Sequence, residues 1–124
     1  MASEDYFQRK LDDKRRLTIP AERRAEFASG VVVTRGYGRY LHLYPKSVWD
    51  QSVEPALRGD ILDEAIADKN VKLRMGKIEA ELDLKQGRIT LEQHQLDYAK
   101  IERDVEAVRV GSYWRLYSPE AINL

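Results

Sequence analysis

The sequence predicts an α+β fold in which two similar halves share one pseudo-symmetric β-barrel with short flanking helices. The halves are visible as two pairs of matching segments that fall in the same order. Residues 38–45 match residues 111–118 without a gap, and residues 16–19 match residues 88–91 at nearly the same separation. Short chance matches rarely agree in both order and separation, so the chain is interpreted as a tandem duplication.

The first half begins with two short strands around a tight turn. Residues 6–11 have the composition of a strand, and residues 12–15 suit a turn. Within residues 16–19, alternation places Leu17 and Ile19 on one face, as a half-buried strand requires. A return strand is therefore expected directly after the turn.

A short helix and a hairpin complete the first half. Pro20 suits the first turn of a helix over residues 21–28, because its missing N–H would have no helical partner there. Gly30 is expected to end that helix. Two β-rich runs, residues 31–35 and 40–44, then follow and join through a glycine-containing loop, which is typical of a hairpin.

The second half repeats this plan. Thr90 is expected to cap its helix, because Gln93 stands at the capping-box spacing. The segments expected to form the strands, the turn and the helix are residues 77–82, 83–87, 88–91, 92–99, 105–110 and 113–117.

Alternation in the hairpins assigns one inward face to each strand. Leu41 and Leu43 point to the core, while His42 lies on the outer face. Trp114 and Leu116 take the matching inward places in the second half. Neither half can close its own sheet, and open edges invite pairing with another copy, so the two halves are expected to interleave their hairpins around one core.

A helical connector is expected between the halves, because residues 46–70 carry an apolar stripe with acidic residues on the opposite side. Pro55 and Gly59 are expected to break this helix into two pieces. The resulting division is a first repeat over residues 6–50, a connector over residues 51–75 and a second repeat over residues 76–122.

Composition favours a globular protein of the cytoplasm. Hydrophobic residues make up 43% and charged residues 34% of the chain, and there is no cysteine. The absence of cysteine excludes a disulfide framework, thiol catalysis and cysteine-ligated zinc. No apolar run approaches the length that a bilayer requires, and no secretory signal is recognisable, so no membrane contact is expected.

Charge is unevenly distributed although the formal net charge is +0. Basic residues outnumber acidic ones in residues 1–50, and acidic residues outnumber basic ones in residues 51–70. The basic cluster over residues 6–24 is compatible with nucleic-acid binding. Taken alone, it fits a solvated surface turn better than a nucleic-acid site.

A motif occurs once in each half. Residues 11–20 read Leu-Asp-Asp-Lys-Arg-Arg-Leu-Thr-Ile-Pro and resemble the AbrB/SpoVT signature, Leu-Asp-x-x-Gly-Arg-aliphatic-x-aliphatic-Pro. A second copy stands at residues 82–89. Together with residues 43–45 and Trp49, the pair is similar to the MraZ family over almost the whole chain. This resemblance implies two AbrB-like swapped-hairpin repeats.

The resemblance also implies a function. Members of that family are DNA-binding transcriptional regulators, typically repressors of the bacterial division and cell-wall gene cluster, and are expected at the nucleoid. They assemble into homo-oligomeric rings and bind double-stranded DNA at short direct repeats of their own promoter. The resemblance implies no metal, no cofactor and no small-molecule substrate. The DNA-binding residues carried over are Arg16 and Arg88, with Lys14, Arg15, Lys85 and Gln86 beside them.

Two departures from the family pattern affect the turns. Arg15 stands where the signature has glycine, and a left-handed backbone there would cost roughly 1–2 kcal/mol. The second motif has one residue more between Asp83 and Arg88 than the usual spacing, so its loop is expected to bulge. Both turns are therefore expected to present their arginines differently from the usual geometry.

The same residues leave two other classes of function to consider. The main alternative is an AbrB-like antitoxin or a protein-interaction scaffold in which the altered turns have weakened DNA binding. An enzyme is disfavoured, because His42 and His94 have no neighbours arranged as a metal-ligand set or a nucleophile-base pair. Adjacent Asp12 and Asp13 suit an acidic turn better than an acid-base pair.

Overall fold

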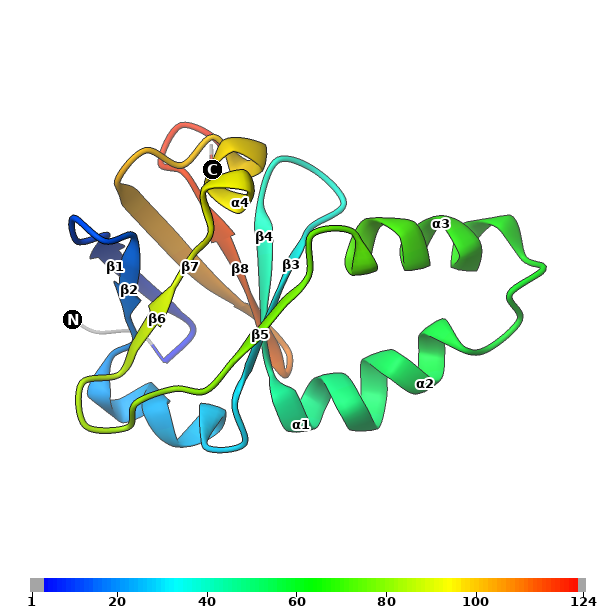
Figure 1. The fold of residues 1–124 in the computed structure, drawn as a ribbon, viewed down its shortest axis with the longest axis horizontal. Helices are drawn as coiled ribbons and strands as arrows, with labels where there is room; N and C mark the ends of the chain where they lie inside the picture. Colours follow the sequence, from blue (N-terminus) through cyan, green and yellow to red (C-terminus); the bar gives the residue numbers. More distant parts are fainter. Residues whose placement is uncertain (1–3, 123–124) are drawn as a thin grey trace.

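The computed structural model describes residues 4–122 and has the α+β fold that the sequence predicts (Figure 1). Its strands are β1 (Tyr6–Lys10), β2 (Arg16–Thr18), β3 (Val31–Arg35), β4 (Leu41–Pro45), β5 (Ile78–Ala80), β6 (Arg88–Thr90), β7 (Asp104–Val110) and β8 (Tyr113–Tyr117). Its helices are the 3₁₀ helix η1 (Ala21–Phe27), α1 (Lys46–Val48), the π-helical segment η2 (Trp49–Val53), α2 (Glu54–Leu57), α3 (Glu64–Arg74) and α4 (Gln93–Ala99).

The strands form two antiparallel sheets, and most pairings join one half of the chain to the other. The larger sheet has the order β1-β7-β8-β4-β3-β5, and the smaller one pairs β2 with β6. In the larger sheet β1 pairs with β7, β4 with β8 and β3 with β5, each time across the two halves. The hairpins β3–β4 and β7–β8 pair as the sequence predicts.

The sequence predicts one pseudo-symmetric β-barrel, and the structure shows that the sheet does not close into a barrel. Among residues 4–122, β1 has a ladder partner only in β7 and β5 only in β3, so the six-stranded sheet stays open. The β2–β6 ladder is too short to bridge those two edges. Pro20, which has no N–H to donate, follows β2 closely, and α4 begins soon after β6. The two short strands pair with each other and form a separate layer.

The larger sheet is covered on both faces. On one face, Leu41 and Leu43 are fully buried in a core that also contains Leu17 and Ile89 of the β2–β6 ladder. The predicted inward side chains of β8, Trp114 and Leu116, belong to the same core and lie opposite Leu43 and Leu41. The ladder therefore closes this side of the core.

The other face of β4 is also buried, although the sequence interpretation placed it on the outside. His42 and Tyr44 are 0% and 2% exposed. The rings of Tyr37, Tyr40 and Tyr113 pack around His42, and Tyr44 packs against Trp49 of the connector. Tyr44 belongs to a second core with Trp49, Leu57 and Leu73 of the connector. The His42 Nδ1 and the Tyr44 hydroxyl are 2.8 Å apart, and burial lowers the pKa of His42 to about 4.

The connector forms an arm that projects from one side of the sheet, with the β2–β6 ladder at the opposite side (Figure 1). Helical structure runs without interruption through α1, η2 and α2, so Pro55 does not break it. In the π-helical segment η2, the Glu54 N–H donates a hydrogen bond to the Trp49 carbonyl. Pro55 follows in the first turn of α2, where its missing N–H leaves no helical hydrogen bond unmade. The break falls after α2, and α3 begins at the N-cap Asp63.

Helix α4 also begins later than predicted. Thr90 remains in the β2–β6 ladder opposite Arg16, and the N-cap is Glu92, whose side chain forms a capping box with Gln95. The helix ends at Lys100 in a left-handed conformation. No helix within residues 4–122 is long and apolar enough to cross a membrane.

Candidate nucleic-acid interface

The β2–β6 ladder brings the two predicted arginines onto one surface. Arg16 pairs with Thr90, and Thr18 pairs with Arg88, with Leu17 opposite Ile89 between them. Directly paired residues and residues two apart on a strand point to the same face. Since Leu17 and Ile89 are buried, the other four side chains form the outer face of a two-stranded ribbon.

The ribbon has one motif turn at each end. Because β2 and β6 are antiparallel, the turn that precedes Arg16 lies at one end and the turn that precedes Arg88 at the other. Lys14 and Arg15 are exposed in the first turn. Lys85 and Gln86 are exposed in the second. The six predicted residues thus share one elongated surface, arranged as two groups around the ladder.

Asp12 organises the first turn. Its Oδ1 accepts hydrogen bonds from the backbone N–H groups of Lys14 and Arg16, both at 2.9 Å. Its Oδ2 accepts a hydrogen bond from the Arg16 Nε at 2.6 Å, and the two half-exposed side chains form an ion pair. Partial burial alone would raise the pKa of the Asp12 carboxyl, but the hydrogen bonds and the charge of Arg16 outweigh it and lower that pKa. Asp12 therefore holds Arg16 in a defined position.

Arg15 occupies the conformation that the family signature assigns to glycine. Its backbone φ is 59°, in the left-handed region. Its carbonyl accepts a hydrogen bond from the Leu91 N–H at 2.9 Å, and its Nε donates one to the Leu91 carbonyl at 3.1 Å. These two bonds attach the first turn to the second half of the chain. They also offset the backbone cost of roughly 1–2 kcal/mol that a side chain has there.

The second turn reaches the same geometry with a different residue. Gly87 has φ 65°, and its carbonyl accepts a hydrogen bond from the Ile19 N–H at 2.6 Å. The Arg24 side chain, from η1, lies directly against Gly87, so a Cβ there would collide with the guanidinium. Arg24 donates from Nε to the Ile19 carbonyl at 2.9 Å and from Nη1 to the Lys85 carbonyl at 2.8 Å. Arg24 thereby ties the second turn to the first half.

Arg88 differs from Arg16 in its partner. The Arg88 Nη2 donates a hydrogen bond to the Gln86 Oε1, a neutral group. Within residues 4–122 Arg88 has no ion pair, and the same is true of Arg15. The cationic charge of Arg88 is therefore available to an outside anion, whereas that of Arg16 is shared with Asp12.

Three residues of this surface are absent from the sequence-based set. Thr18 and Thr90 each lie two residues after an arginine of the same strand, so strand alternation puts them on the same face as that arginine. This spacing is the sequence signal that could have identified them. Arg24 had no such signal. Its role depends on η1 folding back over the second turn, which is a contact between distant parts of the chain.

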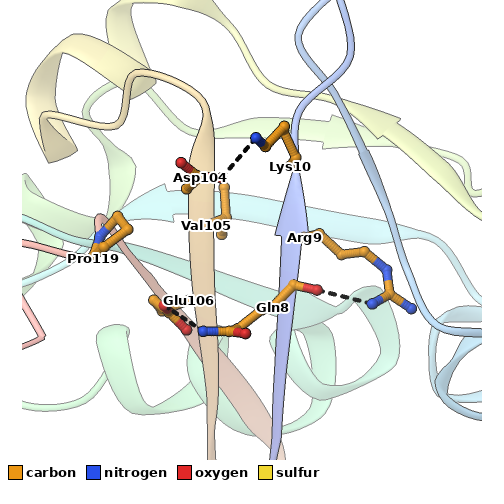
Figure 2. A pocket seen from close by; sticks show the side chains of 7 residues that line it. All are labelled: Gln8, Arg9, Lys10, Asp104, Val105, Glu106 and Pro119. Carbon is orange, nitrogen blue, oxygen red and sulfur yellow. Dashed lines mark hydrogen bonds and ion pairs between the residues drawn. The ribbon is translucent and has the colours of Figure 1, made fainter.

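A hollow of about 260 Å³ lies elsewhere, between β1 and the strand β7 beside it (Figure 2). Its polar side chains bind one another: Gln8 donates to Glu106 at 2.8 Å, and Lys10 lies 3.8 Å from Asp104. Arg9 also lines the hollow, and its Nη1 donates a hydrogen bond to the Gln8 carbonyl (Figure 2). These groups are already satisfied, so the candidate site remains on the β2–β6 ribbon.

Known proteins are similar to this chain over most of its length. The family model described as "MraZ protein, putative antitoxin-like" matches residues 2–65. A protein of Thermomicrobium roseum is 40% identical over 117 residues, which cover 92% of this chain and 80% of the relative. A protein of Syntrophomonas wolfei is 37% identical over 115 residues, 92% of this chain and 79% of the relative. A protein of Salinispora arenicola is 36% identical over 107 residues, 86% of this chain and 73% of the relative.

These relatives belong to one class of protein, since each is named a transcriptional regulator. Identity of this level over most of both chains, together with the matching family model, decides the family. The chain belongs to the MraZ family.

Proposed function

We propose that this chain is a sequence-specific DNA-binding transcriptional regulator that lays the β2–β6 ribbon in the major groove. One observation carries the proposal: Arg16 and Arg88 share the outer face of a two-stranded ribbon with Thr18 and Thr90, flanked at both ends by exposed cationic turns. The major groove, about 12 Å wide, admits a two-stranded β-ribbon. Family membership supports the same class of function.

The spacing of the two arginines suits bases two steps apart. Arg16 and Arg88 lie two register positions apart along the ladder, or roughly 7 Å at about 3.3 Å per residue. Consecutive bases rise by about 3.4 Å, so the two guanidinium groups address positions about two steps apart. A guanidinium that meets guanine O6 and N7 contributes about 1–3 kcal/mol of base discrimination. Lys14, Arg15, Lys85 and Gln86 then serve the flanking phosphates and bases.

Two contacts per chain discriminate weakly, and repetition compensates for this. We propose that several copies assemble into a ring and engage short direct repeats in the promoter, so that avidity multiplies the weak single-site affinity. In this proposal the target is the bacterial division and cell-wall gene cluster, the usual outcome is repression, and each subunit is a tandem duplication of an AbrB-like swapped-hairpin unit. Residues 6–50 and 76–122 are the two units, and residues 51–75 connect them.

The test is a mobility-shift titration on DNA taken from immediately upstream of the protein's own gene. Arg88→Ala is expected to weaken binding about tenfold or more, because it removes an unpaired cation from the ribbon face. Arg16→Ala is expected to weaken it less, since Asp12 already shares the charge of Arg16. Lys72→Ala, an exposed charge on the arm, is the matched control and is expected to bind like the parent.

Salt dependence and footprinting extend the test. Each phosphate contact that a variant loses should reduce the slope of log affinity against log salt by about 0.9. Footprinting of the same upstream DNA should show protected boxes at regular spacing. Unchanged binding by both arginine variants, with folding intact, would remove the ribbon from the DNA interface.

A second function is favoured by one observation. The Asp12–Arg16 ion pair neutralises half of the arginine pair, which suits an antitoxin-like or scaffolding protein whose DNA binding is weakened. The description of the family as antitoxin-like points the same way. Pulldown of the tagged chain with and without nuclease separates the two functions, because only DNA-mediated association disappears on digestion.

A further inference from the structure

The tip of the arm exposes the most accessible large hydrophobic side chain in the described residues. Between α2 and α3, Leu62 is 92% exposed and Ile61 is 63% exposed. Turn-forming carboxylates hold the segment in shape: Asp60 accepts from the Leu62 N–H at 3.2 Å, and Asp63 accepts from the Ala65 N–H at 2.9 Å. Two adjacent aliphatic side chains on a hydrogen-bonded turn form a knob that the ribbon function does not use.

The same arm has an apolar hollow at its base. The hollow has a volume of about 440 Å³ and lies between the connector helices and the β4–β8 side of the sheet. Its walls are aliphatic on the connector side, with Val53, Ala56 and Ile66, and aromatic on the sheet side, with Tyr44 and Tyr113. Pockets of about 300–1,000 Å³ accept whole ligands, so this one has room for two aliphatic side chains.

The knob cannot fill the hollow of its own chain, because Leu62 stays exposed in the folded molecule. The charges of the tip and of the hollow indicate which group occupies the hollow. Asp60, Asp63 and Glu64 make the tip acidic, and these carboxylates have no ion pair within residues 4–122. Lys69 lines the hollow, and it is likewise without an ion pair in that part of the chain. An acidic, aliphatic knob and an apolar, lysine-bordered hollow are complementary surfaces.

We propose that the 60–64 tip of one copy docks into the hollow of a second copy of this chain. Burial of Ile61 and Leu62 against the Tyr44–Tyr113 wall supplies the attraction, and Lys69 meets the acidic tip. Because knob and hollow are different surfaces of one chain, the contact is heterologous and continues from copy to copy until rotation closes a ring. This assignment of the interface rests on the ring assembly proposed above.

The position of the arm makes the contact compatible with DNA binding. The arm and the β2–β6 ribbon lie at opposite ends of the long axis of the molecule (Figure 1). Copies joined through their arms therefore keep the ribbon faces of Arg16 and Arg88 uncovered. Assembly and DNA contact are separate properties and are measured separately.

Cysteine cross-linking tests the contact directly, because the chain has no cysteine of its own. Leu62→Cys and Ala56→Cys are made as single variants, mixed without DNA and oxidised. We expect a disulfide-linked dimer of one variant with the other and much less of either with itself. Leu84→Cys, at an exposed leucine of the second motif turn, is the matched partner that should not cross-link to Ala56→Cys.

Mass measurements supply the second readout. Leu62→Asp is expected to raise the concentration at which half of the chains are assembled by roughly tenfold or more, toward single chains of 14.4 kDa. Val71→Asp, at another exposed apolar site of α3 outside the hollow, is expected to keep the parent mass. Both Leu62→Asp and Val71→Asp should fold, because neither position is buried.

The proposal is overturned if the parent chain is monomeric, if Leu62→Cys and Ala56→Cys fail to cross-link, or if Leu62→Asp assembles like the parent. Cross-linking of Ala56→Cys to Leu84→Cys in its place assigns the hollow to the second motif turn and also overturns it. None of these results depends on DNA. The effect of Arg88→Ala on mobility shift is therefore judged independently, and failure of the ribbon proposal is distinguishable from failure of the docking proposal.

Discussion

The two motif turns at the ends of the ribbon have the same backbone geometry but reach it with different residues. The first places Arg15 in the left-handed conformation and ties itself to Leu91 with that residue's own side chain. The second places Gly87 there, and the corresponding carbonyl, that of Ile19, is bound by Arg24 from η1. The residue allowed at a strained backbone position therefore depends on what packs over it.

The neighbours explain the difference. Arg24 follows Ile19 by five positions and reaches across to the second turn. The residue that follows Leu91 by five positions is Leu96, which is buried in the core and cannot bind a carbonyl with its side chain. The first turn thus lacks an arginine from a neighbouring helix, and Arg15 binds the Leu91 carbonyl itself. Space for that side chain exists only where no equivalent of Arg24 stands.

The largest effect is expected from Gly87→Ala. The left-handed backbone costs about 1–2 kcal/mol, and displacement of Arg24 removes two hydrogen bonds of about 0.5–1.5 kcal/mol each, for a total loss of about 2–5 kcal/mol. Urea unfolding followed by circular dichroism measures this loss. If the explanation is right, Gly87→Ala combined with Arg24→Ala is less destabilised than the sum of the two single variants by about 1 kcal/mol.

A smaller effect separates two substitutions of Arg15. Both Arg15→Ala and Arg15→Gly lose the hydrogen bond from Nε to the Leu91 carbonyl. Only glycine relieves the left-handed backbone, and its greater freedom in the unfolded chain cancels part of that gain. Arg15→Gly is therefore expected to be about 0.5–1 kcal/mol more stable than Arg15→Ala. Equal unfolding midpoints for the two variants would contradict a strained Arg15.

The smallest effect concerns pH and Asp12. The lowered pKa of Asp12 means that the folded protein stabilises its carboxylate, fully at pH well above the ordinary value of 3.8. That contribution is lost as the pH falls through the lowered folded value. The parent is therefore expected to be more stable than Asp12→Asn at pH 7, with the difference shrinking toward zero in acid. Asp83→Asn, in the turn whose arginine pairs with Gln86, is measured beside it as the control.

Much of the fold could be predicted because it follows from local pattern. Alternation correctly placed Leu17, Leu41 and Leu43 in the core, and the matching segments correctly indicated the hairpins β3–β4 and β7–β8. Alternation could not show which groups pack on the second face of a strand. His42 was expected on an outer face, and it is buried because the rings of Tyr37, Tyr40 and Tyr113 pack around it.

The errors at element ends have a similar origin. Thr90 has the sequence of an N-cap, but its backbone is held opposite Arg16 in the ladder, so the helix begins only after Glu92. The open sheet could not be predicted either, because strand order is a long-range property. For the site, the motif located Arg16 and Arg88, while their common face became visible only through the register of β2 with β6.

The pairing of strands across the two halves constrains how the molecule is made. When the ribosome has finished β2, its partner β6 has not yet been synthesised, and β1 likewise waits for β7. Contacts between segments so far apart along the chain slow folding, because the chain loses the entropy of closing a long loop before the contact contributes any stability. A nascent or truncated chain that stops within the arm therefore has no ribbon at all. Only a polypeptide translated beyond β6 can pair both strands of the ribbon, so incomplete protein lacks the surface proposed to contact DNA.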